Sequence, residues 1–427
     1  MRKVKQDYSE MASYLGVDHP DSIQLNYDRT ITPKIKTGTK PNVVVIICES
    51  FSSYKSSMWG NPLNTTPYFD SLCKKGIFFD RCFTPSYGTA RGVWATITGI
   101  PDVEYPKTAS RNPNMVDQNT IINSFVGYNK YYFLGGNANW ANIRGLLKNN
   151  IKGLKLYEQD DYNAKKVDVW GVSDKNLFLN ANEILARDQQ PFFAIIQTAD
   201  NHRPYTIPSE DLKEFKKIEL PEDTLKKYGF ISNDELNAFR YTDFSYRKFI
   251  EAAQKSPYFK NTIFVFVGDH GIRGDAGNMF PKAWTEQALT TVHVPLLFYS
   301  GSLLSPERHD NVCSQLDILP SVADLAGITF TNTTMGKDLF DSSIRMNTFR
   351  YSSAFIIDPD EKKVGMMNND YYLRQMLTTN KKELVSLRDN NPVPAGKLYD
   401  SLAKSLSGMA DSYYQTARYL LYHNKKR

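Results

Sequence analysis

The chain has 427 residues and a formal net charge of +6, the balance of 52 Lys and Arg against 46 Asp and Glu. Its hydrophobic content of 41% and aromatic content of 13% are too high for a disordered chain. Four cysteines are too few for a disulfide scaffold, and a charge of +6 over this length is not typical of a nucleic-acid-binding protein. The longest apolar run, residues 43–48, is far shorter than the roughly 20 residues that cross a bilayer.

The chain begins with a polar, turn-rich stretch, residues 1–40, which predicts a leader that packs on the core or connects to a segment upstream. The pattern changes at residues 42–48, NVVVIIC, a β-branched run typical of a strand buried on both faces of a parallel sheet. Similar runs predict strands at 131–134, 192–197, 262–267 and 294–299, with helices at 67–75, 173–187, 233–255 and 315–325. This alternation predicts an α/β fold with a mostly parallel central sheet and helices on both faces.

The last part of the chain has a different pattern. Residues 347–390 carry alternating, polar-rich stretches that suit a small antiparallel sheet, and residues 397–422 predict a long amphipathic helix. We therefore divide the chain into a connector (1–40), a main domain (41–345) and a C-terminal α+β subdomain (346–427) packed on the core. The cysteines lack metal-ligand or CxxC spacing and are predicted to be buried free thiols: Cys48, Cys73, Cys82 and Cys313.

Metal-type residues follow two of the predicted strands. Glu49 comes directly after the first strand, and Asp269 and His270 come directly after the strand at 262–267. Ligands of parallel α/β sheets gather beyond the carboxyl ends of the strands, where two carboxylates and an imidazole suit a divalent cation such as Mn²⁺, Zn²⁺ or Mg²⁺. A single Glu in this position is also typical of a helix-cap carboxylate, so the combination carries the prediction.

A nucleophile for such a site is expected between these two strand ends. The segment that begins at Phe83, FTPSYGTARGVWATITGIP, is rich in hydroxyl groups, and a hydroxyl bound to a cation is activated without a neighbouring base. At the start of a helix, backbone N–H groups would also receive a phosphoryl oxygen. Composition alone leaves five candidates open: Thr84, Ser86, Thr89, Thr96 and Thr98.

Six strings, in this order along residues 41–345, resemble the lipoteichoic acid synthase-like phosphoglycerol transferases, a group in the sulfatase-like branch of the alkaline phosphatase superfamily. They are NTTPYFDSLCKKGIFFDRCFTPSYGTARGVWATITG, NANWANIRGLL, WGVSDKNLF, QTADNHRPY, FVGDHG, and SQLDILPSVADLAGI. Sulfatases place their modified Cys or Ser nine residues before a Thr-Gly pair, which here is Thr98-Gly99 and so points to Thr89. The sulfatase CxPSR motif is absent, which disfavours a sulfatase proper.

The resemblance implies roles for particular residues. Glu49, Thr89, Asp269 and His270 would bind one divalent cation, with Mn²⁺ preferred over Zn²⁺ or Mg²⁺, and Thr89 would be the nucleophile. His202 would contact the transferred phosphoryl group or protonate the leaving alkoxide, which suits an imidazole; the alternative is a turn histidine bonded to backbone. The implied head-group pocket consists of Trp140, Asn142 and Arg144, in addition to His202. Their spacing departs by two residues from the usual Trp-Asn-Arg tripeptide, so a solvated helix face stays open as an alternative.

Two departures weaken a phosphoethanolamine transferase interpretation. Those enzymes commonly have a second His twelve residues after the Asp-His pair, where this chain has Lys282, and they carry many disulfide cysteines. One metal is therefore favoured over two. His293 precedes a predicted strand and is expected to pack in the core or behind the pocket.

The resemblance implies a phosphoglycerol transferase that acts on a lipid such as phosphatidylglycerol through a covalent threonine intermediate. Its partners would be the phospholipid head group, an alcohol acceptor (a glycolipid or glycerol-phosphate chain) and the membrane surface, but no nucleic acid. It further implies a bacterial cell-membrane protein with an extracellular or periplasmic catalytic domain, whose transmembrane region would lie upstream of these residues. Alternatives are a phosphoethanolamine transferase, a phosphodiesterase or sulfatase-type hydrolase, and a non-catalytic glycerol-phosphate-binding protein.

Overall fold

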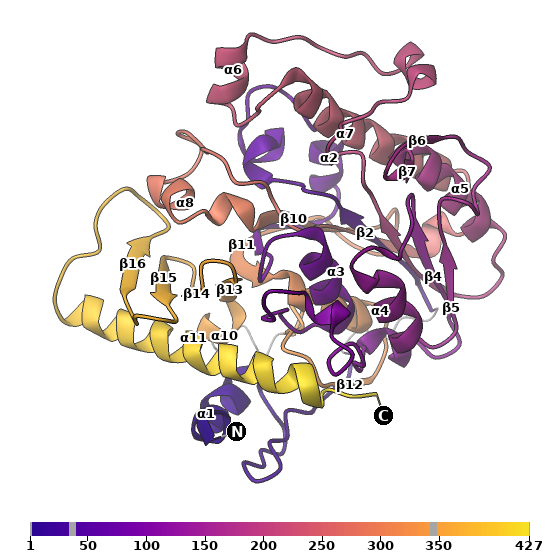
Figure 1. Cartoon of the computed structure of the whole chain (residues 1–427). Coiled ribbons are helices and arrows are strands. Elements are labelled where there is room, and N and C mark those ends of the chain that lie inside the picture. The colour runs from indigo at the N-terminus through magenta and orange to yellow at the C-terminus, as the bar shows by residue number, and fades with distance from the viewer. Residues whose placement is uncertain (1, 34–39, 342–347, 427) are drawn as a thin grey trace.

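The computed structural model describes residues 2–33, 40–341 and 348–426. Its core is an eight-stranded sheet in the order β11-β3-β10-β9-β2-β8-β4-β5 (Figure 1). The strands are β2 (Asn42–Cys48), β3 (Ile77–Phe83), β4 (Asn129–Leu134), β5 (Leu154–Tyr157), β8 (Phe192–Gln197), β9 (Thr262–Gly268), β10 (His293–Tyr299) and β11 (Glu307–Ser314). β10 is antiparallel to its neighbours β3 and β9, and the other pairings are parallel.

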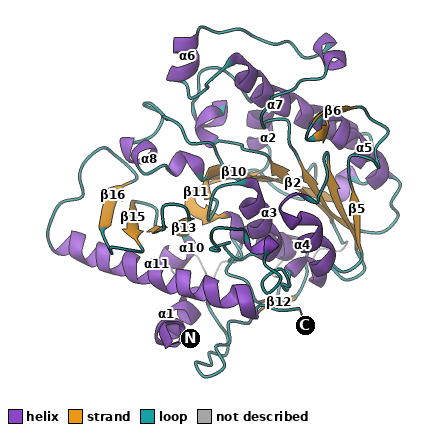
Figure 2. Cartoon of the chain, viewed as in Figure 1, coloured by secondary structure: helices purple, strands orange, loops and turns teal. Residues whose placement is uncertain are grey.

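Helices cover both faces of this sheet, as Figure 2 shows. Alternate residues of β2 belong to two separate hydrophobic clusters, Val43, Val45 and Ile47 to one and Val44, Ile46 and Cys48 to the other. One face packs on α2 (Pro67–Cys73), α5 (Asp174–Ala186) and α7 (Asn233–Ala253); the other packs on α3 (Thr89–Thr98), α4 (Ile143–Asn150) and α9 (Ile318–Leu325). The α/β fold with a mostly parallel sheet is therefore confirmed.

A second sheet of four antiparallel strands follows the central sheet in the chain. It consists of β13 (Ala354–Asp358), β14 (Lys363–Met367), β15 (Tyr371–Met376) and β16 (Lys382–Ser386). The long helix α11 (Lys397–His423) packs on β14 and β15 and lies beside α1 (Arg2–Leu15), as Figure 1 shows. The predicted small C-terminal sheet and helix are thus confirmed.

The smaller elements complete the chain. A two-stranded pair joins β1 (Arg29–Ile31) to β12 (Phe330–Asn332), and a hairpin joins β6 (Lys166–Asp168) to β7 (Gly171–Val172). Short helices are α6 (Glu222–Lys227), α8 (Lys282–Glu286) and α10 (Thr348–Tyr351). The predicted connector contains α1 and β1, while its residues 34–39 and the predicted boundary at 345/346 lie outside the described residues.

All four cysteines are buried and free, as predicted. Within the described residues, no helix combines the length and apolar character that a membrane span requires.

Candidate active site

Three metal-type side chains meet at the carboxyl ends of β2 and β9. These strands are parallel neighbours, with Cys48 opposite Gly268, so the residues that follow them emerge side by side. One ligand atom from each of Glu49, Asp269 and His270 lies within 4.8 Å of the other two. Glu49 and Asp269 are buried, and the His270 side chain is 14% exposed.

The hydrogen bonds of this cluster leave one of its carboxylate oxygens without a partner in the described part of the chain, while Glu49 Oε1 accepts the Ser50 hydroxyl at 2.7 Å. Asp269 Oδ1 accepts the backbone N–H groups of Ser50 at 2.8 Å and His270 at 2.7 Å, whereas Oδ2 is buried with no hydrogen-bond partner among the described residues. His270 Nδ1 donates to the Gly271 carbonyl at 2.7 Å, which leaves the lone pair on Nε2 facing the carboxylates. Two oxygens and one nitrogen in this arrangement fit a divalent cation, which sulfatase-like folds commonly bind.

Burial, and after it the neighbouring Asp269 carboxylate, raise the pKa of Glu49 to about 8. Burial opposes the charged form of the His270 ring, but the carboxylates of Asp269 and Glu49 outweigh it and raise the His270 pKa. The cluster is therefore an electronegative site in which acids repel one another, and a cation would relieve that repulsion.

Thr89 lies against this cluster. Its Oγ1 is 3.2 Å from Glu49 Oε2 and 3.3 Å from His270 Nε2. Of the five hydroxyl candidates, Thr89 has these contacts, whereas Thr96 and Thr98 bond to carbonyls of their own helix, and Thr84 to the carbonyl of Ser86. The structure thus brings Thr89 together with Glu49, Asp269 and His270.

Two glycines allow the nucleophile loop to reach this position. Gly88, directly before α3, has φ of 90°, a conformation that favours glycine, and Thr89 is the first residue of the helix. Gly92 lies one turn later, where a Cβ would come within 2.2 Å of the Asp269 carbonyl oxygen. The start of α3 therefore packs directly on the loop that carries Asp269.

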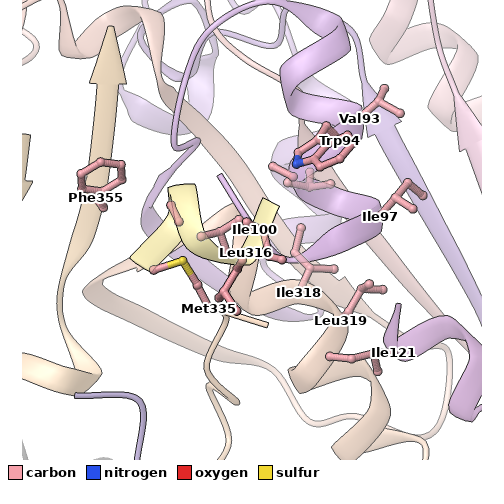
Figure 3. Close-up of a cluster of buried hydrophobic side chains, with 14 of the residues drawn as sticks. Val93, Trp94, Ile97, Ile100, Ile121, Leu316, Ile318, Leu319, Met335 and Phe355 are labelled. Carbon is pink, nitrogen blue, oxygen red and sulfur yellow. The ribbon is translucent and has the colours of Figure 1, made fainter. Parts of the chain in front are cut away.

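The rest of α3 is anchored in the core. Val93, Trp94 and Ile97 pack with residues of α9 and its surroundings, among them Leu316 and Leu319 (Figure 3). Because these side chains are fully or almost fully buried, the helix is held rigidly and Thr89 has a fixed position at its exposed end.

A cavity of about 310 Å³ opens beside the cluster and is lined by Glu49 and Thr89 on one side. His202, Trp140 and Trp170 line it as well. The His202 ring packs on the Trp170 ring with centroids 4.4 Å apart, and its Nδ1 donates to the Arg203 carbonyl at 2.8 Å. His202 Nε2 is therefore the nitrogen available for acid–base work in this cavity.

The other predicted pocket residues lie outside the cavity lining. Asn142 has φ of 58° and donates its amide to the Ser110 carbonyl at 2.6 Å. Arg144 pairs with Glu158 at 2.6 Å and donates to Asn139 Oδ1 at 2.9 Å. Because Asn139 lines the cavity, Arg144 supports its wall from behind in this structure.

His293 is a core residue. Its ring stacks on Phe83 and meets the Trp284 ring edge-on, and its Nε2 donates to the Asp80 carbonyl at 2.8 Å. Burial lowers the His293 pKa to about 3, so the ring is neutral.

Sequence reasoning missed several residues that shape the site. Trp170 occurs in WGVSDKNLF, but the string alone gives no sign that its ring would contact the His202 ring. Thr198 Oγ1 accepts the Glu49 N–H at 2.9 Å, and Asn201 donates to the Glu49 and Ser50 carbonyls at 3.1 Å each. For Asn201, its position directly before His202 in the sequence was the one feature that could have indicated a role in the site.

The family model described as Sulfatase matches residues 41–328, well over half of the chain. The chain belongs to the sulfatase family, whose members and their lipoteichoic acid synthase relatives are phosphotransferase and hydrolase enzymes of the alkaline phosphatase superfamily. The resemblance drawn from the sequence is confirmed at this level.

Curated relatives and solved structures agree with that assignment. The chain is 23% identical over 346 residues to the lipoteichoic acid synthase of Staphylococcus saprophyticus, covering 76% of the chain and 51% of the relative. The same enzyme of Staphylococcus aureus is 23% identical over 323 residues, covering 70% and 48%. The chain thus spans about half the length of the curated relatives it matches.

Two solved structures share the fold over nearly the whole chain. An alkaline phosphatase superfamily protein from Vibrio parahaemolyticus has a TM-score of 0.79 at 22% identity, covering 99% of this chain and 97% of that one. The lipoteichoic acid synthase LtaP from Listeria monocytogenes has a TM-score of 0.75 at 18% identity, covering 98% and 99%.

Proposed function

We propose that the chain is the catalytic part of a metal-dependent phosphoglycerol transferase that acts on a phosphatidylglycerol-like lipid. The observation that carries this proposal is the contact of Thr89 Oγ1, at the start of α3, with both Glu49 and His270. A sulfatase places a modified Cys or Ser at this position, whereas a threonine hydroxyl suits the transferase relatives.

Thr89 acts as the nucleophile. Its hydroxyl loses a proton to water, Oγ1 forms a bond to phosphorus, and the ester bond between phosphorus and the diacylglycerol oxygen breaks. His202 protonates the leaving alkoxide from Nε2. It then takes a proton from the hydroxyl of an acceptor, a glycolipid or glycerol-phosphate chain, whose oxygen bonds to phosphorus and displaces Thr89. The bond between phosphorus and Oγ1 breaks, and Oγ1 regains a proton from water.

Glu49, Asp269, His270 and Thr89 would hold the divalent cation, for which we propose Mn²⁺, with Zn²⁺ or Mg²⁺ as alternatives. The bound cation would lower the pKa of the Thr89 hydroxyl and offset negative charge on the phosphoryl oxygens. Trp140 contributes an aromatic wall for the head group, and Arg144 orders Asn139 in the same wall.

We also propose that the natural setting is a bacterial cell envelope, with this part of the chain outside the cell membrane or in the periplasm. The donor lipid then lies in the membrane surface that the enzyme faces.

The test is head-group release from phosphatidylglycerol in vesicles, with each divalent cation in turn. Thr89→Ala is expected to abolish release, while the control Thr96→Ala, on the same helix with its hydroxyl bonded to the Gly92 carbonyl, retains it. Mass spectrometry of the wild type after incubation should find phosphoglycerol on Thr89. Undiminished release by Thr89→Ala would refute the mechanism.

Each alternative function predicts a different result in these assays. Release from phosphatidylethanolamine in place of phosphatidylglycerol would indicate a phosphoethanolamine transferase, and release without transfer to an added alcohol would indicate a phosphodiesterase. Cleavage of an aryl sulfate would indicate a sulfatase. Binding of glycerol phosphate without any turnover would indicate a non-catalytic protein.

A further inference from the structure

A second cavity, of about 490 Å³, adjoins the nucleophile on another side. His270 and Gly88, the residue before Thr89, line it, whereas Glu49 and Thr89 line the first cavity. None of the described residues lines both cavities. Because Thr89 Oγ1 is 3.3 Å from His270 Nε2, the two cavities meet at the pair of groups that would contact a reacting phosphorus.

The C-terminal sheet builds the far wall of this second cavity. Ile356 and Asp358 of β13, Lys363 of β14, and Tyr372 and Arg374 of β15 all line it. They face the loop that follows His270, which forms the opposite wall.

Hydrogen bonds fasten this sheet to the nucleophile loop. The Ile357 N–H donates to the Pro85 carbonyl at 2.7 Å, four residues before Thr89, and the Tyr87 hydroxyl bonds to Asp360. On the other side, Trp284 of α8 donates its indole N–H to the Leu387 carbonyl at 3.2 Å. The wall is therefore fixed relative to the nucleophile.

The lining suits an uncharged alcohol. Apolar side chains such as Leu289, Val292 and Ile356 form part of it. Two of its three cations are paired, Lys363 with Glu361 and Arg374 with Glu383, and the third, Arg273, acts on the Asp358 carboxylate of the same lining. A second phosphate would find these charges neutralised, whereas a glyceride or glycoside would find apolar surface with hydrogen-bonding groups at the rim.

We propose that the second cavity binds one of the two alcohol arms of a phosphodiester whose other arm lies in the first cavity. A sulfate or phosphate monoester has a single organic arm and needs one cavity, whereas a diester has two. The C-terminal sheet then supplies the wall that this second arm contacts. This inference rests on the proposed transferase function and specifies the substrate class that its centre accepts.

The test uses the buried state of the native cysteines. Since all four are buried, an exposed cysteine introduced at the rim by Glu361→Cys can be labelled selectively with a bulky maleimide after the protein has folded. The control is Lys381→Cys, an exposed position on the same sheet, in the turn between β15 and β16 and outside the cavity lining. Unlabelled and labelled proteins are compared on bis(p-nitrophenyl) phosphate, a diester, and p-nitrophenyl phosphate, a monoester.

The label on Glu361→Cys is expected to lower the ratio of diester to monoester kcat/KM by about tenfold or more, because it blocks the second arm alone. The label on Lys381→Cys should leave that ratio unchanged. An unchanged ratio after complete labelling of Glu361→Cys, an equal fall for both labelled proteins, or a wild type that cleaves monoesters but no diester would each overturn the proposal. A wild type that cleaves bis(p-nitrophenyl) phosphate but releases nothing from phosphatidylglycerol would refute the transferase function and leave this test intact.

Discussion

Asp174, the first residue of α5, holds the turn that carries His202. Its Oδ1 accepts the Ala199 N–H at 2.7 Å and its Oδ2 accepts the Asp200 N–H at 3.2 Å, while Asp200 accepts the Asp174 N–H at 2.6 Å. The same turn presents Thr198 to the backbone of Glu49. Because Asp174 touches no reacting group, it is a positioning residue, and Asp174→Asn should impair catalysis through this turn.

The magnitude follows from the two acceptor oxygens. An asparagine keeps one acceptor and turns an NH₂ group toward the other backbone N–H, so one hydrogen bond to a charged group is lost, about 1.5–3 kcal/mol. A displacement of the turn by about 1 Å would misplace His202 and the backbone of Glu49 together. Errors of this size cost on the order of 10²-fold in rate, which is the fall in kcat that we expect.

Asp243 of α7 provides the matched control. It is also a buried carboxylate whose two oxygens accept two consecutive backbone N–H groups, those of Tyr68 at 3.0 Å and Phe69 at 2.7 Å. Burial raises the pKa of both acids to about 7, so the assays are run near pH 8, where both are ionised.

Asp174→Asn and Asp243→Asn should change the free energy of thermal unfolding by similar amounts, because each replaces a buried carboxylate that accepts two backbone N–H groups. Only the first should lose turnover of bis(p-nitrophenyl) phosphate and affinity for Mn²⁺. Equal activity losses at equal stability, or full activity in Asp174→Asn, would refute the positioning role.

Three further predictions concern packing and charge. Gly92→Ala should weaken Mn²⁺ binding and lower stability by about 1–3 kcal/mol, because its Cβ would lie 2.2 Å from the Asp269 carbonyl oxygen; calorimetry measures both. Lys55→Met should cost about 3–5 kcal/mol in chemical unfolding, since it leaves Glu235 buried without its partner at 2.6 Å, and adding Glu235→Leu should recover much of that loss. Because burial raises the folded-state pKa of Asp243 to about 7, the folded protein holds this proton more tightly than the unfolded chain. Stability should therefore fall between about pH 4 and pH 7, by at most about 1.4 kcal/mol per unit for this group, and Asp243→Asn should flatten the slope of thermal stability against pH.

The central strands could be predicted because their sequences are continuous apolar runs. The strand β2 and the strand β9 are buried along their whole length, and both were found from the sequence. β3 and β11 were missed because polar residues interrupt them: Asp80 and Arg81 in IFFDRCF, and a half-exposed first part in ERHDNVCS. β10 was found, but nothing in HVPLLFY signals that it runs antiparallel to its neighbours.

The candidate site likewise has a part that the sequence predicts, the metal-type residues, and a part that it does not, the cavities. Glu49 and Asp269 lie together because they follow two adjacent parallel strands, and both strands can be recognised in the sequence. A hydroxyl between them in the chain was expected because a metal site of this kind needs a nucleophile. The cavities do not follow from such patterns. The contact of the Trp170 ring with the His202 ring depends on a hairpin whose Gly171 lies against the backbone of Gly135. This contact joins distant segments, so no local sequence pattern predicts it.

The second cavity is the feature of the site that the sequence predicts least. Its two walls come from residues near His270 and near Ile356, which belong to different sheets. The metal-type residues indicate where a phosphoryl or sulfuryl group would react. They do not indicate how many organic groups of the substrate the active site accommodates. That property depends on the docking of the C-terminal sheet, through the Ile357 N–H to the Pro85 carbonyl and the Tyr87 hydroxyl to Asp360. Chains with the same metal motif and a different C-terminal sheet should therefore differ in their preference between monoesters and diesters while sharing the nucleophile and the cation.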